Sequence, residues 1–293
     1  MARPDQYPLS LTLLRLMYHH LGSLMPAHLG RMAYHSWFSP ARFNMPERER
    51  GALDSAVTGV VAVDDIEVTT YRWGGSASPV ILFVHGWSGR GSQAHAFVEP
   101  VLNAGFSLLS FDAPAHGRTE GRQSSVLQFA DCLLALQQQA GSFHGCITHS
   151  VGGMALALAA QFGFAPGRAV CLCPPNDFDS VIQNFQRTLR LPDSVVREML
   201  KLLYATHGNL VKQLLRVENN AANIDFPALL IHDRDDPEIP WQDSEKIHHA
   251  WRHSELMLTD TLKHHRIVRD EQVVEAAVRY LCCERQTPQL SSR

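Results

Sequence analysis

The feature that most constrains this chain is an alternation of short β-branched runs with stretches of helical periodicity, which begins near residue 57. The runs predict strands at 57–63, 67–73, 80–84, 106–111, 145–148 and 169–172, and helices are predicted at 92–103, 124–140 and 151–162. Alternation of this kind indicates parallel strands connected by crossover helices. The sequence therefore predicts an α/β fold with a mostly parallel central sheet flanked by helices.

Two segments depart from this pattern. Residues 1–56 carry apolar residues at helical spacing and predict a helical N-terminal extension, whereas residues 174–223 lose the strand signal and predict a helical lid inserted into the core. Strands are expected again at 228–231 and 255–258, with helices at 242–251 and 271–283. The predicted division is an extension at 1–56, an α/β core at 57–173 and 224–284, a lid at 174–223 and a polar tail at 285–293.

Composition excludes several classes of protein. With 45% hydrophobic and 19% charged residues, the 293-residue chain resembles an ordinary globular protein. Its formal charge of −3 leaves no basic excess for a phosphate backbone, so nucleic acid is not an expected partner. The six cysteines lie mostly in apolar stretches without CxxC spacing, which predicts reduced core residues and no metal site. Without a recognisable signal peptide or membrane-spanning segment, the expectation is a soluble cytoplasmic protein.

Ser150 occupies the most informative position in the chain. The segment THSVGG, residues 148–153, lies where a predicted strand ends and a predicted helix begins. A tight turn there lifts the serine hydroxyl above the sheet edge and directs helix N-terminal N–H groups toward a developing oxyanion. Thr148 occupies the first glycine position of the usual GxSxG pattern. The alternative is that Ser150 simply caps an ordinary helix.

A second strand end supplies a candidate oxyanion loop. His85-Gly86-Trp87 follows the apolar run 80–84, at the edge where open α/β sheets place their ligands. The backbone N–H groups of Trp87 and Val151 are therefore the candidate oxyanion donors. His85 is expected to tie down this loop, and Asp112 is expected to accept backbone amides in the loop 111–118.

Together these motifs resemble the α/β-hydrolase superfamily, in its serine esterase/lipase-like branch with a helical lid. The resemblance covers roughly residues 57–284. It is carried by HGW at 85–87, DAPAHG at 112–117, HSVGG at 149–153, HDRDDPEIP at 232–240 and LKHHRIV at 262–268. The family implies a nucleophilic serine, then an acid after a late strand, then a histidine near the C-terminus. It also implies catalysis without a cofactor or a metal.

Carried over by position, the resemblance places the nucleophile at Ser150. Aligning Ile239-Pro240 with the end of the family's acid loop selects Asp236, with Asp235 as the alternative. The base aligns with His264, with His265 as the alternative. The acid loop carries four carboxylates, Asp233, Asp235, Asp236 and Glu238. Those other than the catalytic acid are expected to be solvated. Asp233 occupies a position where the family usually has a glycine.

The expected function is hydrolysis of a carboxylic ester in a small acyl substrate, through an acyl-enzyme. Thioester, amide or carbon–carbon bond hydrolysis on the same triad is an alternative, and so is a non-catalytic binding protein on the same fold. An apolar face of the lid is expected to roof the pocket; it includes Val181, Phe185, Leu189, Met199, Leu202 and Leu203. The extension is expected to pack against the hydrolase core or a second subunit, which leaves a homodimer open, and membrane contact is the least favoured role.

Overall fold

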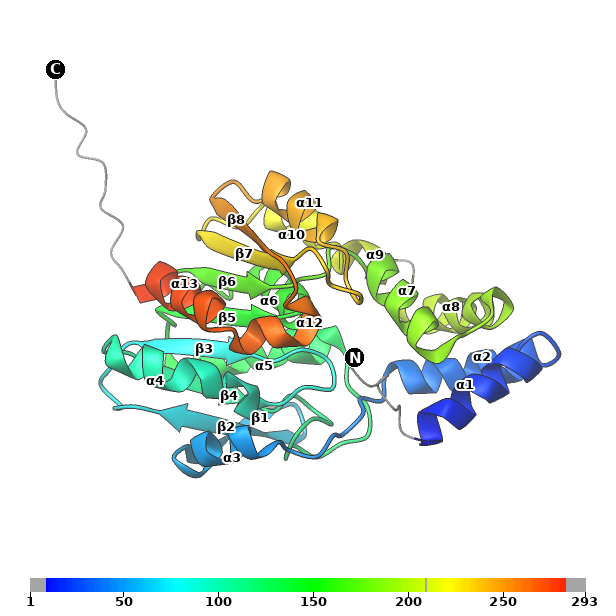
Figure 1. The fold of residues 1–293 in the computed structure, drawn as a ribbon, viewed down its shortest axis with the longest axis horizontal. Coiled ribbons are helices and arrows are strands. Elements are labelled where there is room, and N and C mark those ends of the chain that lie inside the picture. The colour runs from blue at the N-terminus through cyan, green and yellow to red at the C-terminus, as the bar shows by residue number, and fades with distance from the viewer. Residues whose placement is uncertain (1–8, 209, 283–293) are drawn as a thin grey trace, which may run out of the picture.

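The computed structural model describes residues 9–208 and 210–282, so the predicted tail at 285–293 lies outside the described residues. Figure 1 shows the sheet between two layers of helices. Its eight strands are β1 (Val57–Val63), β2 (Ile66–Trp73), β3 (Val80–Val84), β4 (Ser107–Phe111), β5 (Gly145–His149), β6 (Ala169–Leu172), β7 (Ala228–Asp233) and β8 (Ser254–Thr259). They are ordered β1-β2-β4-β3-β5-β6-β7-β8, and only the β1–β2 and β2–β4 pairs are antiparallel. The predicted α/β fold with a mostly parallel sheet is confirmed.

The central strands are apolar because helices cover both of their faces. Strands β4, β5, β6 and β7 are buried along their whole length, as expected for parallel strands between two helical layers. One layer contains α5 (Val126–Ala140), α6 (Val151–Ala160) and α11 (Gln242–Ala250); the other contains α3 (Glu47–Asp54), α4 (His95–Asn103) and α13 (Glu271–Cys282). Each layer has its own hydrophobic core.

Strand register brings the candidate motifs together. In the parallel β3–β5 pair, Val84 lies opposite Thr148, so the segment that follows Val84 emerges beside Ser150. The β7–β8 pair is also parallel, with Asp233 opposite Thr259. A short helix after β8, α12 (Lys263–Arg266), carries His264 at the same carboxyl edge. The sheet alone therefore places all the candidate loops on one side of the molecule.

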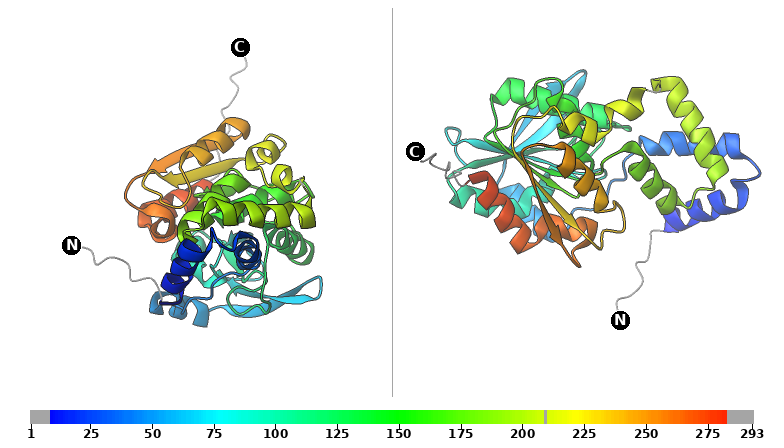
Figure 2. Two further views of the ribbon diagram at one scale, coloured as in Figure 1. Left: turned by 90° about the vertical axis from the view of Figure 1, so that its right-hand side faces the viewer. Right: turned by 90° about the horizontal axis from the view of Figure 1, so that it is seen from above.

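Two helices of the predicted extension and two of the predicted lid form one four-helix layer beside this edge. Figures 1 and 2 show α1 (Leu9–Leu21) and α2 (Pro26–Trp37) lying against α7 (Phe178–Leu189) and α8 (Asp193–His207). Trp37 contacts Phe178 and Phe185, with ring centroids 5.3 and 5.2 Å apart. Two short helices, α9 (Leu210–Leu214) and α10 (Val217–Ala221), return the chain to β7. None of the described helices is long and apolar enough to span a membrane.

This arrangement refines the expectation for the extension. Helix α3 packs on the α/β core, where Leu53 is buried and the Trp73 indole N–H donates to Ala52 O at 2.7 Å. The segment between α2 and α3 also bonds to the core, since the Ser124 N–H donates to Phe38 O at 2.7 Å. Helices α1 and α2 instead cover part of the lid's apolar face, because the pairing of two amphipathic helices is decided by shape as well as by periodicity. Of the predicted lid residues, Leu189, Met199 and Leu203 are buried, while Val181, Phe185 and Leu202 are half-buried.

Gly30 provides a test of this packing. A Cβ at Gly30 would lie 2.5 Å from Glu198 Cβ and 3.1 Å from Met199 N on α8. Gly30→Ala should push α2 away from α8 and lower the free energy of unfolding by about 1–3 kcal/mol, measured by urea denaturation. Gly51→Ala in α3 is the control, because a Cβ there meets no atom within 4 Å; it should be neutral or slightly stabilising. Equal stability of the two variants would contradict the α2–α8 contact.

Candidate active site

Ser150 sits in a strained turn between β5 and α6. Its φ of 53° and ψ of −125° lie outside helical geometry, and its side chain does not cap α6. The Ser150 N–H donates to Leu172 O on β6 at 2.8 Å, which ties the turn to the neighbouring strand. The predicted strained turn is confirmed, and a plain helix N-cap does not describe this serine.

Two glycines let the loop after β3 approach this turn. A Cβ at Gly152 would lie 2.9 Å from Val84 O, and one at Gly86 would lie 3.1 Å from Ser150 Cβ. The loop that carries Trp87 therefore lies directly against Ser150. Val151 is the first residue of α6, so its N–H has no acceptor in a preceding helical turn. The two predicted oxyanion donors thus belong to segments in contact with the serine.

Neutral histidines anchor the Trp87 loop. His85 Nε2 accepts the Ala113 N–H and His116 Nε2 accepts the Ser88 N–H, both at 3.0 Å. Each ring donates its Nδ1–H to a nearby carbonyl oxygen, which fixes the tautomer. Burial lowers the pKa of His85 to about 4 and that of His116 to about 3, so both rings remain uncharged at neutral pH. The expectation that His85 is structural agrees with these contacts.

Asp112 anchors the neighbouring loop as expected. Its carboxylate accepts the Gly91 and Arg118 N–H groups at 2.6 and 2.7 Å, and the Tyr71 hydroxyl at 2.6 Å. The Trp87 loop and the loop 111–118 are therefore both held in place by buried polar contacts rather than by packing alone.

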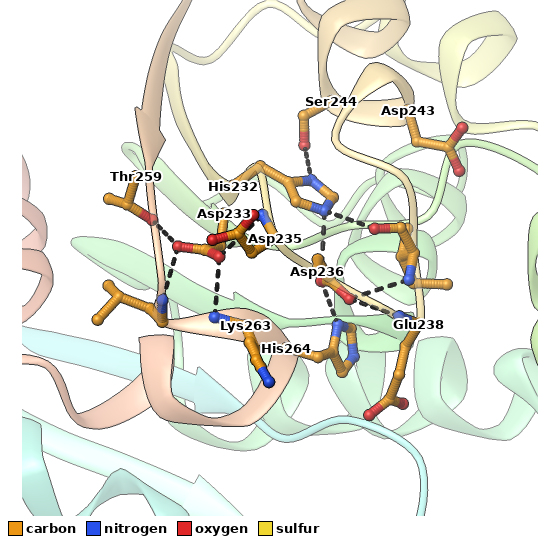
Figure 3. A network of polar contacts seen from close by, with 12 residues as sticks. His232, Asp233, Asp235, Asp236, Glu238, Asp243, Ser244, Thr259, Lys263 and His264 are labelled. Carbon is orange, nitrogen blue, oxygen red and sulfur yellow. Dashed lines mark hydrogen bonds and ion pairs between the residues drawn. The ribbon is translucent and has the colours of Figure 1, made fainter. Parts of the chain in front are cut away.

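His264 and Asp236 meet at the carboxyl edge (Figure 3). His264 Nδ1 lies 2.6 Å from Asp236 Oδ2, and the His264 side chain is only 4% exposed. Asp236 Oδ1 accepts the Glu238 and Ile239 N–H groups at 2.8 and 3.0 Å. Burial raises the pKa of Asp236, but the hydrogen bonds from His232 and His264 outweigh it and hold that pKa well below its usual range. Asp236 is therefore an ionised acceptor for the imidazole.

The alternative residues make other contacts. Asp235 is exposed, and its Oδ2 accepts the Thr261 N–H at 3.1 Å. The His265 side chain is 68% exposed, and its Nε2 lies 2.8 Å from Glu238 Oε1. Of the four acid–base combinations considered, the structure brings Asp236 and His264 into direct contact.

Asp233 was expected to be solvated, and this prediction is wrong. Its side chain is buried, and its two carboxylate oxygens accept four hydrogen bonds; the donors are Thr259 Oγ1, Asp235 N, Leu262 N and Lys263 N. Strand β7 continues to Asp233 instead of ending at 231, so the residue is the strand's last and lies inside the sheet edge. Glu238 is likewise engaged, through His265, rather than free in solvent.

Cys173 completes the cluster beside Asp236. Its Sγ, an Asp236 oxygen and a His264 ring nitrogen all lie within 4.8 Å of one another, a donor set of the kind that binds zinc. Burial raises the pKa of the Cys173 thiol well above its ordinary value, and Asp236 and His264 already bond to each other. Metal binding would need a thiolate and would break that hydrogen bond. A protonated thiol against the carboxylate fits the structure better.

His149, the residue before Ser150, also contacts His264, with ring centroids 4.9 Å apart. Its Nε2–H donates to His264 O at 2.9 Å. Burial, reinforced by the neighbouring His264 and His265, lowers the pKa of His149 to about 3. Like His85 and His116, His149 is therefore uncharged in the folded protein at neutral pH.

These three histidines predict sensitivity to acid. Their folded pKa values of about 3 to 4 lie below the unfolded value of 6.5, so their neutral contacts stabilise the fold fully above pH 6.5 and progressively less below it. The free energy of unfolding should fall between pH 7 and 4 by up to about 1.4 kcal/mol per pH unit for each histidine. Urea unfolding measures this, and His116→Gln should reduce the slope by about one proton. A stability that stays flat from pH 7 to 5 would contradict the neutral assignments.

Known proteins resemble this chain in sequence and in fold. A sequence model described as the alpha/beta hydrolase family matches residues 81–277. One curated relative, the dihydrolipoyllysine-residue acetyltransferase component of the acetoin cleaving system of Cupriavidus necator, is 29% identical over 206 residues, 67% of this chain and 53% of the relative. Another, esterase Rv0045c of Mycobacterium tuberculosis, is 30% identical over 118 residues, 39% of this chain and 38% of the relative. The chain spans about half or less of the length of these relatives.

Among solved structures, the Pyrococcus furiosus esterase Pf2001 superposes with a TM-score of 0.61 at 19% sequence identity, covering 83% of this chain and 98% of that protein. At that identity the similarity concerns the fold alone. The family match, in contrast, runs from β3 to α13 and includes every strand that contributes a loop to the Ser150 edge. The chain belongs to the α/β hydrolase family.

Proposed function

We propose that the protein is a serine hydrolase that cleaves carboxylic esters through an acyl-enzyme. Ser150 is the nucleophile, His264 the general base and Asp236 the residue that orients His264. The observation that carries the proposal is the 2.6 Å contact of His264 Nδ1 with Asp236 Oδ2, at the sheet edge that also holds the strained Ser150 turn.

The geometry supports a definite division of roles. Because ionised Asp236 accepts the Nδ1–H, the unprotonated nitrogen of neutral His264 is Nε2, which can take the Ser150 proton. Attack of Ser150 Oγ on the ester carbon moves charge to the carbonyl oxygen, where the Trp87 and Val151 N–H groups would stabilise it. His264 then returns the proton to the leaving alcohol. Water, activated by the same imidazole, releases the acid and restores Ser150.

The substrate class draws support from a curated relative. The name of Rv0045c identifies that protein as an esterase, and its 30% identity over 118 residues favours an ester over the alternative thioester, amide or carbon–carbon bond. The intact Ser150, Asp236 and His264 favour an enzyme over a non-catalytic binding protein on the same fold. Apart from the substrate and water, the proposed steps use groups of this chain.

The first test is covalent labelling. A fluorophosphonate probe should modify Ser150, as located by peptide mass spectrometry, and Ser150→Ala should abolish both labelling and turnover of a p-nitrophenyl ester. Ser125→Ala is the matched control, because Ser125 caps α5 outside the proposed site and should leave labelling unchanged. Esterase activity that survives in Ser150→Ala would exclude Ser150 as the nucleophile.

A second test separates the two candidate acids. Asp236→Asn should lower kcat by about 10³–10⁴-fold, because a neutral amide no longer selects the Nδ1–H tautomer of His264. Asp235→Asn should lower kcat less than tenfold, on the order of a surface hydrogen bond. Steady-state kinetics on the same ester measures both, and the reverse ranking would move the acid to Asp235.

A further inference from the structure

The Asp233 carboxylate is buried next to the segment that carries His264 (Figure 3). Lys263 N and Asp235 N donate to Oδ1 at 2.9 and 3.1 Å, while Leu262 N and Thr259 Oγ1 donate to Oδ2 at 3.0 and 2.9 Å. Within the described residues, no cationic side chain forms an ion pair with Asp233. Its negative charge is therefore balanced by backbone amides and one hydroxyl, three of these donors coming from the segment 259–263.

That segment needs such support because its backbone is strained. Thr261 and Lys263 have φ values of 68° and 60°, in the left-handed region that favours glycine. Non-glycine residues there cost about 1–3 kcal/mol each unless their surroundings hold them. Three successive amides donate to carboxylates at the end of β7: Thr261 N to Asp235, and Leu262 N and Lys263 N to Asp233. Asp233 thus bonds the two residues immediately before His264.

His264 is consequently fixed at both its backbone and its ring. Asp233 holds the amides before it, and His149 donates to its carbonyl oxygen. Asp236, three residues after Asp233, accepts its Nδ1–H. Asp233 therefore fixes the backbone position of His264, and Asp236 fixes the orientation of its ring.

We propose that Asp233 is a positioning residue: it stabilises the left-handed backbone before His264 so that the imidazole reaches both Asp236 and Ser150. This inference rests on the proposed role of His264 as the base. Misplacement of a reacting group by about 1 Å can reduce a rate by about 10²-fold, so support of the backbone has a direct kinetic consequence.

Asp233→Asn tests the proposal with little change in volume. Both oxygens accept hydrogen bonds, so an amide in either orientation directs its NH₂ group at backbone N–H donors. We expect kcat to fall at least about tenfold, with KM changing less than about threefold, because an interaction that aligns the base acts mainly on the chemical step. Asp243→Asn is the matched control: Asp243 is also a buried acid and accepts the Asn176 N–H at 3.0 Å, but it bonds no residue of 259–264. Its kcat should stay within about twofold of wild type.

A rescue experiment separates positioning from general stability. Glycine adopts positive φ without strain, so Lys263→Gly removes part of the need for Asp233. The double variant Asp233→Asn/Lys263→Gly should recover at least about threefold in kcat over Asp233→Asn, in a cycle that also includes Lys263→Gly alone. Recovery of kcat supports positioning. A kcat for Asp233→Asn equal to that of Asp243→Asn, or a loss that Lys263→Gly does not relieve, would overturn it.

Proton NMR of the His264 Nδ1–H keeps this test independent of turnover. Asp233→Asn should weaken or abolish the downfield resonance of the hydrogen bond from His264 Nδ1 to Asp236, because the ring would no longer hold that contact. An unchanged resonance would overturn the positioning role even if wild type cleaves esters. Failure of wild type to cleave any ester would instead count against the proposed function, and the resonance would still decide the role of Asp233.

Discussion

The contact between Asp236 and His264 joins segments 28 residues apart and imposes strict requirements on both. A buried carboxylate is unfavourable unless its oxygens are bonded, and here the amides of Glu238 and Ile239 and the His232 ring supply donors in addition to His264. His232 is itself oriented, with Nδ1 2.7 Å from Ser244 Oγ and Nε2 3.1 Å from Ile239 O. The loop after β7 is therefore organised around keeping one anion in place.

The same loop connects the site to the lid. Glu238 pairs with His265 on α12. Two residues of α7 also bond to Glu238: Asn184 Nδ2 donates to the Glu238 carboxylate at 3.4 Å, and Arg187 donates to the Glu238 backbone oxygen at 2.9 Å. Helix α7 in turn packs against Trp37 of the N-terminal extension. The extension, the lid and the acid loop thus form a continuous set of contacts. A displacement of α7 would therefore disturb Glu238, which lies two residues after Asp236.

Much of this structure could be predicted from the sequence because its signals are local or ordered along the chain. Alternating strand and helix periodicity predicts the mostly parallel sheet, and the motifs that resemble the α/β-hydrolase family point to Ser150, Asp236 and His264 as candidates, with Asp235 and His265 as alternatives. The burial of Asp233 was not predictable in the same way, because it depends on β7 extending two residues past its apolar run and on amides 30 residues later. The packing of α2 on α8 at Gly30 likewise depends on matching two surfaces that share no local sequence signal.

The hydrogen bond from His264 Nδ1 to Asp236 is the central claim, and proton NMR can observe it directly. A proton shared by an imidazole and a buried carboxylate at this short separation should resonate far downfield of the amide region. The resonance should persist in Ser150→Ala and in Asp235→Asn and disappear in Asp236→Asn and in His264→Gln. A downfield resonance that survives in Asp236→Asn, or one that is lost in Asp235→Asn alone, would contradict this account.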